Sequence, residues 1–248
     1  MINKRPDTNV YYVSVKQTCS LLEALTHYLP QLVKPQQLID SGGVWRSKKR
    51  LTESKTTVIS GDELKIYECP TQGHGYGFSQ ESIIKETDDW VVVMKEPLVS
   101  IGMDRSNMYF NLMAGLNTYY GFPDMQKGVQ PITRLDYRVS GLCLFSKNKA
   151  AERRLFVQMQ RRRIKKRYLA VVDGSSPIRY KRYTNNDPLN YQRKAFVSSD
   201  GKPSKTRFIL KTETHDNQHI YQAITKTGRR HQVRAHAATS IGPLVNDE

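Results

Sequence analysis

A chain of 248 residues is long enough to bury one large core or two modest ones. Its 39 Lys and Arg against 23 Asp and Glu give a formal charge of +16, which suits a polyanionic partner. There is no apolar run of membrane-spanning length, no signal-peptide pattern in residues 1–9, and no CxxC pair among the three cysteines. We therefore expect nucleic acid rather than membrane as the partner, a reducing cytoplasmic location, and no metal site.

The first part of the chain predicts an arm and a small domain. Residues 1–11 predict a loosely attached arm, and residues 12–69 a compact unit. Within this unit Leu21, Leu25 and Leu29 recur at helical spacing, and Pro35 is suited to open a second short helix. Residues 42–50 then predict a hairpin with a basic tip, and residues 57–67 predict a strand, a turn and a strand.

The hairpin tip carries cations that we expect to reach RNA phosphates: Arg46, Lys48, Lys49 and Arg50. Trp45 is available to pack or stack beside them. Alternatively, the cluster is only a solvated turn. In the first case its loss is expected to weaken binding more than chemistry.

A second domain is predicted to follow a linker. Residues 70–80 are rich in glycine and lack periodicity, which indicates an interdomain linker, and they match neither GxGxxG nor a P-loop. Residues 81–248 predict the second domain. It opens with an apolar strand at 88–95 that ends before Pro97, and residues 111–120 predict a short helix.

The stretch at 131–147 holds the candidate reactive group. Asp136 lies between Arg134 and Arg138 and shortly before residues 142–145, which predict a buried strand that is apolar on both faces. A carboxylate held at the rim of a sheet by a rigid strand is a common way to fix a catalytic group. The alternative is a surface aspartate paired with one of the two arginines.

A basic run follows the central strand. Residues 149–164 predict an amphipathic helix, and residues 161–167 carry six charges in seven positions beside Tyr168. We expect Arg163, Lys165 and Lys166 from this run to track an RNA backbone, which would make binding salt-sensitive. A solvated helix face is the alternative interpretation.

The remaining elements complete the predicted fold class. Residues 168–172 predict a strand, and residues 175–194 a polar loop. Residues 206–212 and 219–225 predict paired strands, and residues 232–239 the start of a helix. This order of strands and helices predicts an α+β domain built on a bent antiparallel or mixed sheet.

Three segments resemble motifs of the RluA-type pseudouridine synthases, in family order. They are the Arg-Leu-Asp triplet at 134–136 with its Ser-Gly-Leu strand, the tyrosine segment at 165–172, and the arginine segment at 227–236. With a similar start near residues 88–102, the resemblance covers most of residues 81–248. Residues 12–69 resemble the S-four-like RNA-binding module that often precedes this family. The resemblance implies a small helix-helix-hairpin domain followed by a synthase domain with a mixed, largely antiparallel sheet and flanking helices.

The resemblance also implies catalytic roles, without a cofactor. Asp136 is the carboxylate that attacks the sugar or the base, or steadies a cationic sugar. Tyr168 stacks on the target base and relays a proton. Arg234 pairs with Asp136, keeping it ionised and aimed. From the residues alone, the pattern favours a core aromatic at Tyr168, and the alternative for Arg234 is a phosphate contact or a helix-start charge.

RNA contacts are implied around these three residues. A uridine in folded RNA has to swing out of its stack, and Arg134 resembles the family arginine that enters the vacated space. Alternatively, Arg134 is a structural partner of a nearby acid. Arg229, Arg230 and His231 are expected to contact phosphates or bases in the turn before Arg234.

Two departures from the family pattern bear on these expectations. Thr133 stands where the family usually has His before Arg-Leu-Asp. The chain also stops at residues 242–248, where relatives continue with sheet and helix over the site, so we expect a catalytic domain without its usual C-terminal end. A truncated chain, a fragment and a divergent member are alternatives.

The function implied is that of an RNA pseudouridine synthase acting as a monomer. Ribosomal RNA is the expected substrate because the front module is of ribosomal type, and transfer RNA stays open. The alternative is an RNA-binding protein that keeps the fold without isomerising uridine, acting in RNA folding or ribosome assembly.

Overall fold

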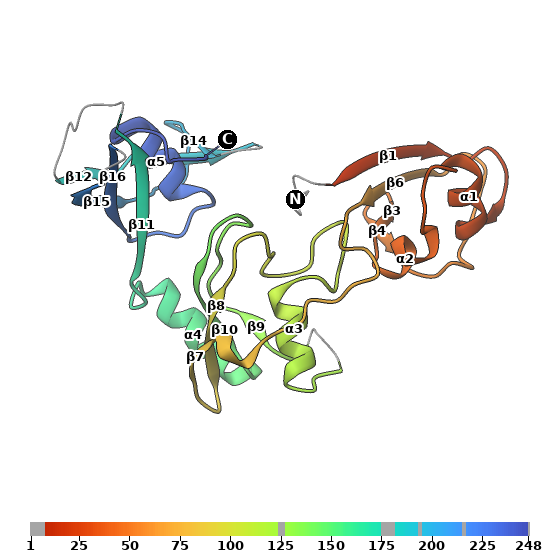
Figure 1. Cartoon of the computed structure of the whole chain (residues 1–248), viewed down its shortest axis with the longest axis horizontal. Coiled ribbons are helices and arrows are strands. Elements are labelled where there is room, and N and C mark those ends of the chain that lie inside the picture. Colours follow the sequence, from red (N-terminus) through yellow and green to blue (C-terminus); the bar gives the residue numbers. More distant parts are fainter. Residues whose placement is uncertain (1–7, 124–126, 175–181, 193–194, 215–216, 248) are drawn as a thin grey trace. The chain divides into compact units, whose positions relative to one another are not determined.

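The computed structural model describes residues 8–123, 127–174, 182–192, 195–214 and 217–247. The chain divides into two compact units, Met1–Leu155 and Phe156–Glu248 (Figure 1). Each unit is described by itself. Among the described residues, no helix has the length and apolar character needed to cross a membrane. Nor does any group of three or more His, Cys, Asp or Glu side chains in this part of the chain lie close enough together to hold a metal ion.

Unit 1 begins with a four-stranded antiparallel sheet of order β1-β6-β3-β4. Its strands are β1 (Asn9–Ser14), β3 (Val44–Arg46), β4 (Lys49–Leu51) and β6 (Glu63–Glu68). The helices are α1 (Leu21–Tyr28) and α2 (Pro35–Asp40), and the short strands β2 (Cys19–Ser20) and β5 (Thr57–Val58) pair with each other. The two predicted helices and the hairpin are confirmed. The last residues of the expected arm belong to β1, and residues 1–7 lie outside the described part.

Local sequence explains where the two helices begin. Ser20 caps α1 by accepting from the backbone of Glu23, whose carboxylate accepts from the Ser20 N–H in return. This capping box satisfies donors that the first turn leaves open. Pro35 stands at the first position of α2, where its missing N–H costs nothing. Both helices bury their leucines against the sheet, in a core that includes Leu21, Leu25, Leu38, Val44 and Ile66.

A second antiparallel sheet carries the central strand of the predicted site. Its order is β7-β8-β10-β9, with β7 (Ile83–Glu86), β8 (Trp90–Lys95), β9 (Gln130–Pro131) and β10 (Gly141–Ser146). The 3-10 turn η1 (Gln80–Ser82) precedes it, and α3 (Leu112–Tyr119) packs on its apolar face, capped by Asn111. The core between them contains Val91, Val93, Leu112, Leu116, Cys143 and Phe145.

One expectation about β10 is wrong. Residues 142–145 were predicted to be buried on both faces, but of these four only Cys143 and Phe145 are fully buried, whereas Leu142 is 56% exposed. The apolar run therefore conceals an alternating strand. Leu142 lies opposite Met94 of β8, which is also exposed, so this face carries apolar side chains without burying them.

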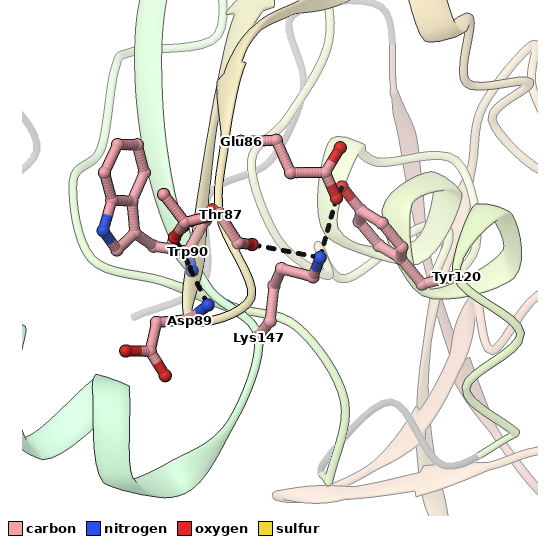
Figure 2. Close-up of polar contacts among 6 residues, drawn as sticks. All are labelled: Glu86, Thr87, Asp89, Trp90, Tyr120 and Lys147. Carbon is pink, nitrogen blue, oxygen red and sulfur yellow. Dashed lines mark hydrogen bonds and ion pairs between the residues drawn. The ribbon is translucent and has the colours of Figure 1, made fainter.

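A polar cluster fixes the end of the β8–β10 pair that lies away from Asp136. Lys147 follows β10, and its ammonium contacts the Glu86 carboxylate at 2.7 Å and the Thr87 carbonyl at 3.2 Å (Figure 2). The Tyr120 hydroxyl donates to the same carboxylate at 2.7 Å. The hydrogen bond from Lys147 lowers the pKa of Glu86, with a further contribution from Tyr120. The cluster thus joins the β7–β8 turn to the end of α3.

Helix α4 (Lys149–Gln160) is shorter than the predicted 149–164. Arg162 adopts a left-handed backbone with φ of 56°, and the N–H of Arg163 returns to the Gln158 carbonyl. The last turn therefore closes on itself instead of continuing as a helix. As a result, the basic run lies at a helix end and a turn rather than along one helix face.

Unit 2 is a four-stranded antiparallel sheet of order β11-β16-β15-β12 with α5 (Gln232–Ser240) on one face (Figure 1). The strands are β11 (Lys166–Asp173), β12 (Arg182–Asn185), β15 (Thr206–Glu213) and β16 (Gln218–Thr225). A separate hairpin joins β13 (Leu189–Tyr191) to β14 (Ala195–Val197). The predicted pairing of residues 206–212 with 219–225 is confirmed.

The predicted loop at 175–194 is wrong where it is described, since β12 and β13 lie within it. Residues 175–181 and 193–194 of this prediction lie outside the described part. All pairings between named strands in the described residues are antiparallel. The architecture is therefore an α/β mixture with antiparallel sheets.

Candidate active site

Asp136 lies in the loop between β9 and β10, and the start of this loop is tied to β10. The backbone N–H groups of Ile132 and Thr133 both donate to the Leu144 carbonyl, at 2.8 and 3.2 Å. The Thr133 hydroxyl accepts from the Leu144 N–H at 2.9 Å. Thr133, which departs from the family pattern, therefore anchors the loop with its hydroxyl.

The far side of Asp136 is tied to the end of β8. The Tyr137 carbonyl accepts from the Leu98 N–H at 2.8 Å and from the Lys95 ammonium at 3.1 Å. Within the loop, the Val139 N–H donates to the Asp136 carbonyl at 3.0 Å. The backbone around the carboxylate is thus held from both neighbouring strands.

Lys95 is fully buried at the end of β8, and sequence reasoning missed it. Its ammonium also donates to the carbonyls of Glu96, at 2.7 Å, and Val99, at 2.8 Å, so three acceptors match its three N–H groups. Burial lowers the pKa of Lys95 to about 8, against opposing effects of Cys143 and, to a smaller extent, of the Asp136 charge. The carboxylate of Asp136 therefore lies within electrostatic reach of a buried cation. The feature of the sequence that could have indicated this role is a single lysine at the end of an apolar strand.

The two arginines that flank Asp136 have exposed side chains. Leu135, between Arg134 and Asp136, packs against the core of the second sheet. This alternation directs Arg134 toward solvent, where an RNA can reach it. Its entry into a vacated base stack stays a prediction.

Tyr168 lies on β11 of unit 2, opposite Ala223 of β16. Its half-buried ring packs against the core that Ala170 and Val172 form with α5. The predicted common face of Tyr168, Ala170 and Val172 is therefore confirmed. Stacking on a base and proton relay by Tyr168 stay predictions.

The turn before α5 is held from inside by the buried side chain of Gln232. Its carbonyl oxygen accepts from the Thr227 hydroxyl at 2.7 Å and from the Arg229 N–H at 3.0 Å. Its amide donates to the Lys205 carbonyl at 3.0 Å and to the Thr206 hydroxyl at 2.9 Å. With every hydrogen-bonding position used, Gln232 fixes the shape of the turn that carries Arg229, Arg230 and His231.

His236, one turn further along α5, is a buried structural residue. Its Nδ1 lies 2.9 Å from the Thr206 hydroxyl, and its Nε2 lies 3.0 Å from both the Ser204 hydroxyl and the Asp187 carbonyl. Burial lowers the pKa of His236. The imidazole therefore joins α5 to β15 and to the segment before β13.

Lys166 faces inward beneath the same turn, although it was expected to contact RNA. Its ammonium donates to the Thr227 carbonyl at 3.2 Å, and burial lowers the pKa of Lys166. A side chain at Gly228 would come within 2.8 Å of this ammonium, so the glycine permits the close approach. Arg163 and Lys165 of the same run are exposed.

The arginine turn meets an aromatic residue that sequence reasoning missed. The guanidinium carbon of Arg230 lies 4.2 Å from the centre of the Tyr191 ring, and the His231 ring meets Tyr191 edge-on at 5.8 Å. Arg229 donates from Nε to the Pro203 carbonyl at 3.2 Å. The hairpin of β13 and β14 thus orients the cations that precede α5. The feature of the sequence that could have indicated this contact is an aromatic residue, Tyr191, within a basic polar stretch.

Arg234 lies on α5 and forms an ion pair with Asp247 of the same unit. The two side chains are partly exposed, by 26% for Arg234 and 22% for Asp247, so water reaches this charge-assisted hydrogen bond. The ion pair expected between Arg234 and Asp136 joins residues of different units and stays a prediction.

At the N-terminal hairpin the four expected RNA contacts differ in their surroundings. Arg46 pairs with Asp62 at 2.7 Å, which lowers the pKa of Asp62. Arg50 is half-buried, whereas Lys48 and Lys49 are exposed at the tip. RNA binding by these residues stays a prediction.

Comparison with known proteins identifies the family. A family model described as RNA pseudouridylate synthase matches residues 90–239. Ribosomal large subunit pseudouridine synthase C of Haemophilus influenzae is 27% identical over 228 residues, covering 87% of this chain and 64% of that protein. The enzyme of the same name from Yersinia pestis is 31% identical over 165 residues, covering 65% and 50%.

A solved structure shows the same fold. Human RNA Pseudouridylate Synthase Domain Containing 1 matches with a TM-score of 0.55 and 27% identity over 67% of each chain. The present chain spans only about half to just under two thirds of the length of the curated relatives named above. Because the family model matches more than half of the chain, including Asp136, Tyr168 and Arg234, this protein belongs to the RNA pseudouridylate synthase family.

Proposed function

We propose that this protein isomerises uridine to pseudouridine in structured RNA, with Asp136 as the reactive carboxylate. The single observation that carries the proposal is the family match over residues 90–239, within which Asp136 lies in a loop tied to two strands. A carboxylate on a rigid loop can attack an electrophilic carbon and leave again.

The reaction needs neither an oxidant nor a second substrate. The bond between ribose C1′ and ring N1 breaks, the base turns, and C1′ bonds to C5. The proton on C5 is lost, and N1 takes up a proton. Tyr168 and Arg234 are proposed to support this sequence, the first by stacking on the base and the second by pairing with the reactive carboxylate.

Large-subunit ribosomal RNA is the proposed substrate. The curated relatives named above are called ribosomal large subunit pseudouridine synthases, and the formal charge of +16 suits a phosphate backbone. We further propose that Arg134 enters the space left by the flipped uridine. Four exposed cations, Lys48, Lys49, Arg163 and Lys165, are proposed to follow the backbone.

Loss of the C5 proton provides the test. The protein is incubated with large-subunit ribosomal RNA labelled with tritium at C5 of uridine, and released label is counted. We expect release by the parent and by Asp88→Asn, which changes an exposed carboxylate before β8, but none by Asp136→Asn. Tight RNA binding without release from the parent would contradict the enzymatic proposal and favour an RNA-binding protein of the same fold.

A further inference from the structure

The N-terminal module, residues 9–69, is joined to the turn at 104–108 through contacts of Trp45. Two guanidinium groups lie over the Trp45 ring, that of Arg50 at 4.6 Å and that of Arg105 at 5.4 Å from its centre. The indole N–H donates to the Arg105 carbonyl at 2.9 Å. Trp45 is only 8% exposed, so this strand residue of the module is buried by a residue about 60 positions further along the chain.

The contact is reciprocal, because each guanidinium also bonds to the opposite part. Arg50 of the module donates to the Asp104 carbonyl at 2.5 Å. Arg105 of the turn donates to the Tyr67 hydroxyl of the module at 2.6 Å. A backbone bond from the Met108 N–H to the Ser41 carbonyl, at 3.0 Å, adds a further link. Side chains and backbone therefore hold the two parts together.

Two glycines allow this close approach. A Cβ atom at Gly42 would lie 2.7 Å from the Arg50 side chain and 2.8 Å from the Met108 sulfur. A Cβ atom at Gly43 would lie 3.2 Å from the Ser106 carbonyl oxygen of the turn, and 2.7 Å from the Tyr67 carbonyl oxygen within the module. Gly42 also has a φ of +76°, a conformation that other residues adopt only with strain. The sequence before β3 is therefore adapted to the contact.

The connecting segment at 70–80 is held as well. The Asn107 side-chain amide donates to the carbonyls of Thr71, at 2.5 Å, and His74, at 3.2 Å. The Gly73 N–H donates to the Ser41 hydroxyl at 2.8 Å, and Tyr76 packs against the core of the second sheet. This segment thus has fixed contacts along its length, unlike a flexible glycine linker.

Packing continues from the turn to the strand that follows Asp136. The Asp104 carboxylate accepts from the backbone N–H groups of Ser106 and Asn107, both at 2.8 Å, which fixes the turn. Helix α3 begins shortly afterwards, and its Leu112 shares a core with Phe145 of β10. A series of close packing contacts therefore connects the module to β10, the strand that follows the Asp136 loop.

The module presents its exposed cations at a different place from the contact. Arg50 contacts Trp45 and Arg46 pairs with Asp62, whereas Lys48 and Lys49 are exposed at the tip of the same hairpin. The residues that dock the module and those that face solvent thus occupy different positions on one β-hairpin. Docking consequently sets the position of the exposed pair.

We propose that this contact, formed by Trp45, Arg50 and Arg105, makes the module a rigid spacer that holds Lys48 and Lys49 at one distance from the Asp136 loop. An RNA with phosphates at that distance from its target uridine is selected over one that lacks them. Trp45 and Arg105 are positioning residues in this scheme, since they act through the lysines. The selection rests on the proposed function, whereas the rigid docking does not.

The docking is tested without reference to activity. Spin labels are attached at Glu53→Cys in the module and Lys85→Cys on β7, both exposed, in a Cys19→Ser background, because Cys69 and Cys143 are buried. We expect one narrow distance distribution that broadens in Arg105→Ala, a change outside the module. Trp45→Phe, which keeps an aromatic ring, although a smaller one, and loses the indole N–H, is expected to broaden it less. A broad distribution in the parent would overturn the proposal.

The selection is tested by comparing two RNAs. The probes are large-subunit ribosomal RNA and a short stem-loop cut from it around the modified uridine. Rigid coupling of two contacts raises the effective concentration of the second, so Arg105→Ala should lower kcat/KM about tenfold on the long RNA and little on the stem-loop. The double variant Lys48→Ala, Lys49→Ala should show the same loss of kcat/KM on the long RNA, with the distance distribution unchanged. Lys55→Ala should leave kcat/KM on both RNAs unchanged.

The outcomes separate the two proposals. Equal losses on both RNAs indicate general damage to the fold and overturn the spacer, as does an unchanged rate on both. If the parent releases no label, the proposed function fails, and the affinities for the same two RNAs are measured in place of kcat/KM. The spacer proposal then holds only if Arg105→Ala weakens binding of the long RNA and not of the stem-loop.

Discussion

The buried ammonium of Lys95 donates to the carbonyl of Tyr137, one residue after Asp136, at 3.1 Å. The same group donates to Glu96 and Val99, so one cation joins the end of β8 to the loop of the candidate carboxylate. Its position follows from β8 pairing with β10, in which Lys95 lies opposite Gly141. Loop geometry therefore depends on a residue that makes no contact with solvent.

Replacement of Lys95 by Met should damage both stability and catalysis. Three carbonyls lose the ammonium as a donor, of which only that of Tyr137 is known to keep another, the Leu98 N–H, and we expect the free energy of unfolding to fall by about 2–4 kcal/mol. Urea unfolding measures this change, and label release from RNA measures the loss of activity. Lys85→Met, an exposed change on β7, is the control and should alter neither. An unchanged unfolding midpoint in Lys95→Met would contradict the assigned role.

Lys95 should also impose a pH dependence on stability. Burial lowers its pKa from 10.5 to about 8 in the folded protein, so between these values the unfolded chain binds more protons. The free energy of unfolding should therefore rise with pH across that window, by on the order of 3 kcal/mol. This gain should be lost again as the pH falls back toward 8. Because tyrosines ionise in the same range, the measured quantity is the difference between the parent and Lys95→Met. A difference independent of pH would disprove the shift.

Gln232→Leu should distort the arginine turn. The leucine removes the partner of Thr227, of the Arg229 N–H and of two groups on β15 or just before it, which should lower the free energy of unfolding by about 2–3 kcal/mol. It should also raise KM for RNA, because Arg229 and Arg230 lose their orientation. Chemical unfolding and steady-state kinetics measure the two effects. Gln160→Leu, at the exposed end of α4, is the matched control.

His236 should make the protein less stable in mild acid. Its pKa is lowered by burial, so in a window below 6.5 the unfolded chain is protonated while the folded protein still holds a neutral imidazole. Stability is thus complete above about 6.5 and declines as the pH falls toward the folded pKa. Thermal unfolding at a series of pH values should show a slope that His236→Gln reduces and that His27→Gln, exposed on α1, retains.

Tyr191 should support RNA binding through Arg230. The ring holds the guanidinium at 4.2 Å, and a partly exposed cation–π contact of this kind contributes about 0.5–1 kcal/mol. Tyr191→Leu should therefore weaken RNA binding roughly two- to fivefold, whereas Tyr191→Phe should bind as the parent does. Filter binding at two salt concentrations measures both. Equal weakening by Leu and Phe would assign the effect to the hydroxyl instead.

Local pattern predicted most elements of this fold but few of its contacts. Helical spacing located α1, and strand pattern located β15 and β16, because periodicity and capping are encoded within a few residues. The exposure of Leu142 was missed because an apolar run looks alike whether one face is covered or both. The Lys95–Tyr137 contact joins residues 42 positions apart, a separation at which periodicity carries no information.

The candidate site shows the same division. Asp136 was located on its loop by the residues around it, while the anchors that hold this loop come from β8 and β10. Lys166 was grouped with its basic neighbours, although the first position of a strand turns it inward. The composition gives the number of cations in the chain. Which of them make internal contacts, and are therefore not available to RNA, depends on the tertiary structure.

The glycines at 42 and 43 carry a consequence for building chimaeras. A methyl group at Gly42 would lie 2.8 Å from the Met108 sulfur, and one at Gly43 would lie 3.2 Å from the Ser106 carbonyl oxygen, so the front domain and the turn at 104–108 form one matched pair of surfaces. Replacing residues 9–69 by those of a relative would exchange only one of the two surfaces. The new domain would then pack poorly unless residues 104–108 of the same relative were introduced with it. Engineers who wish to redirect such a protein to another RNA should exchange both segments together.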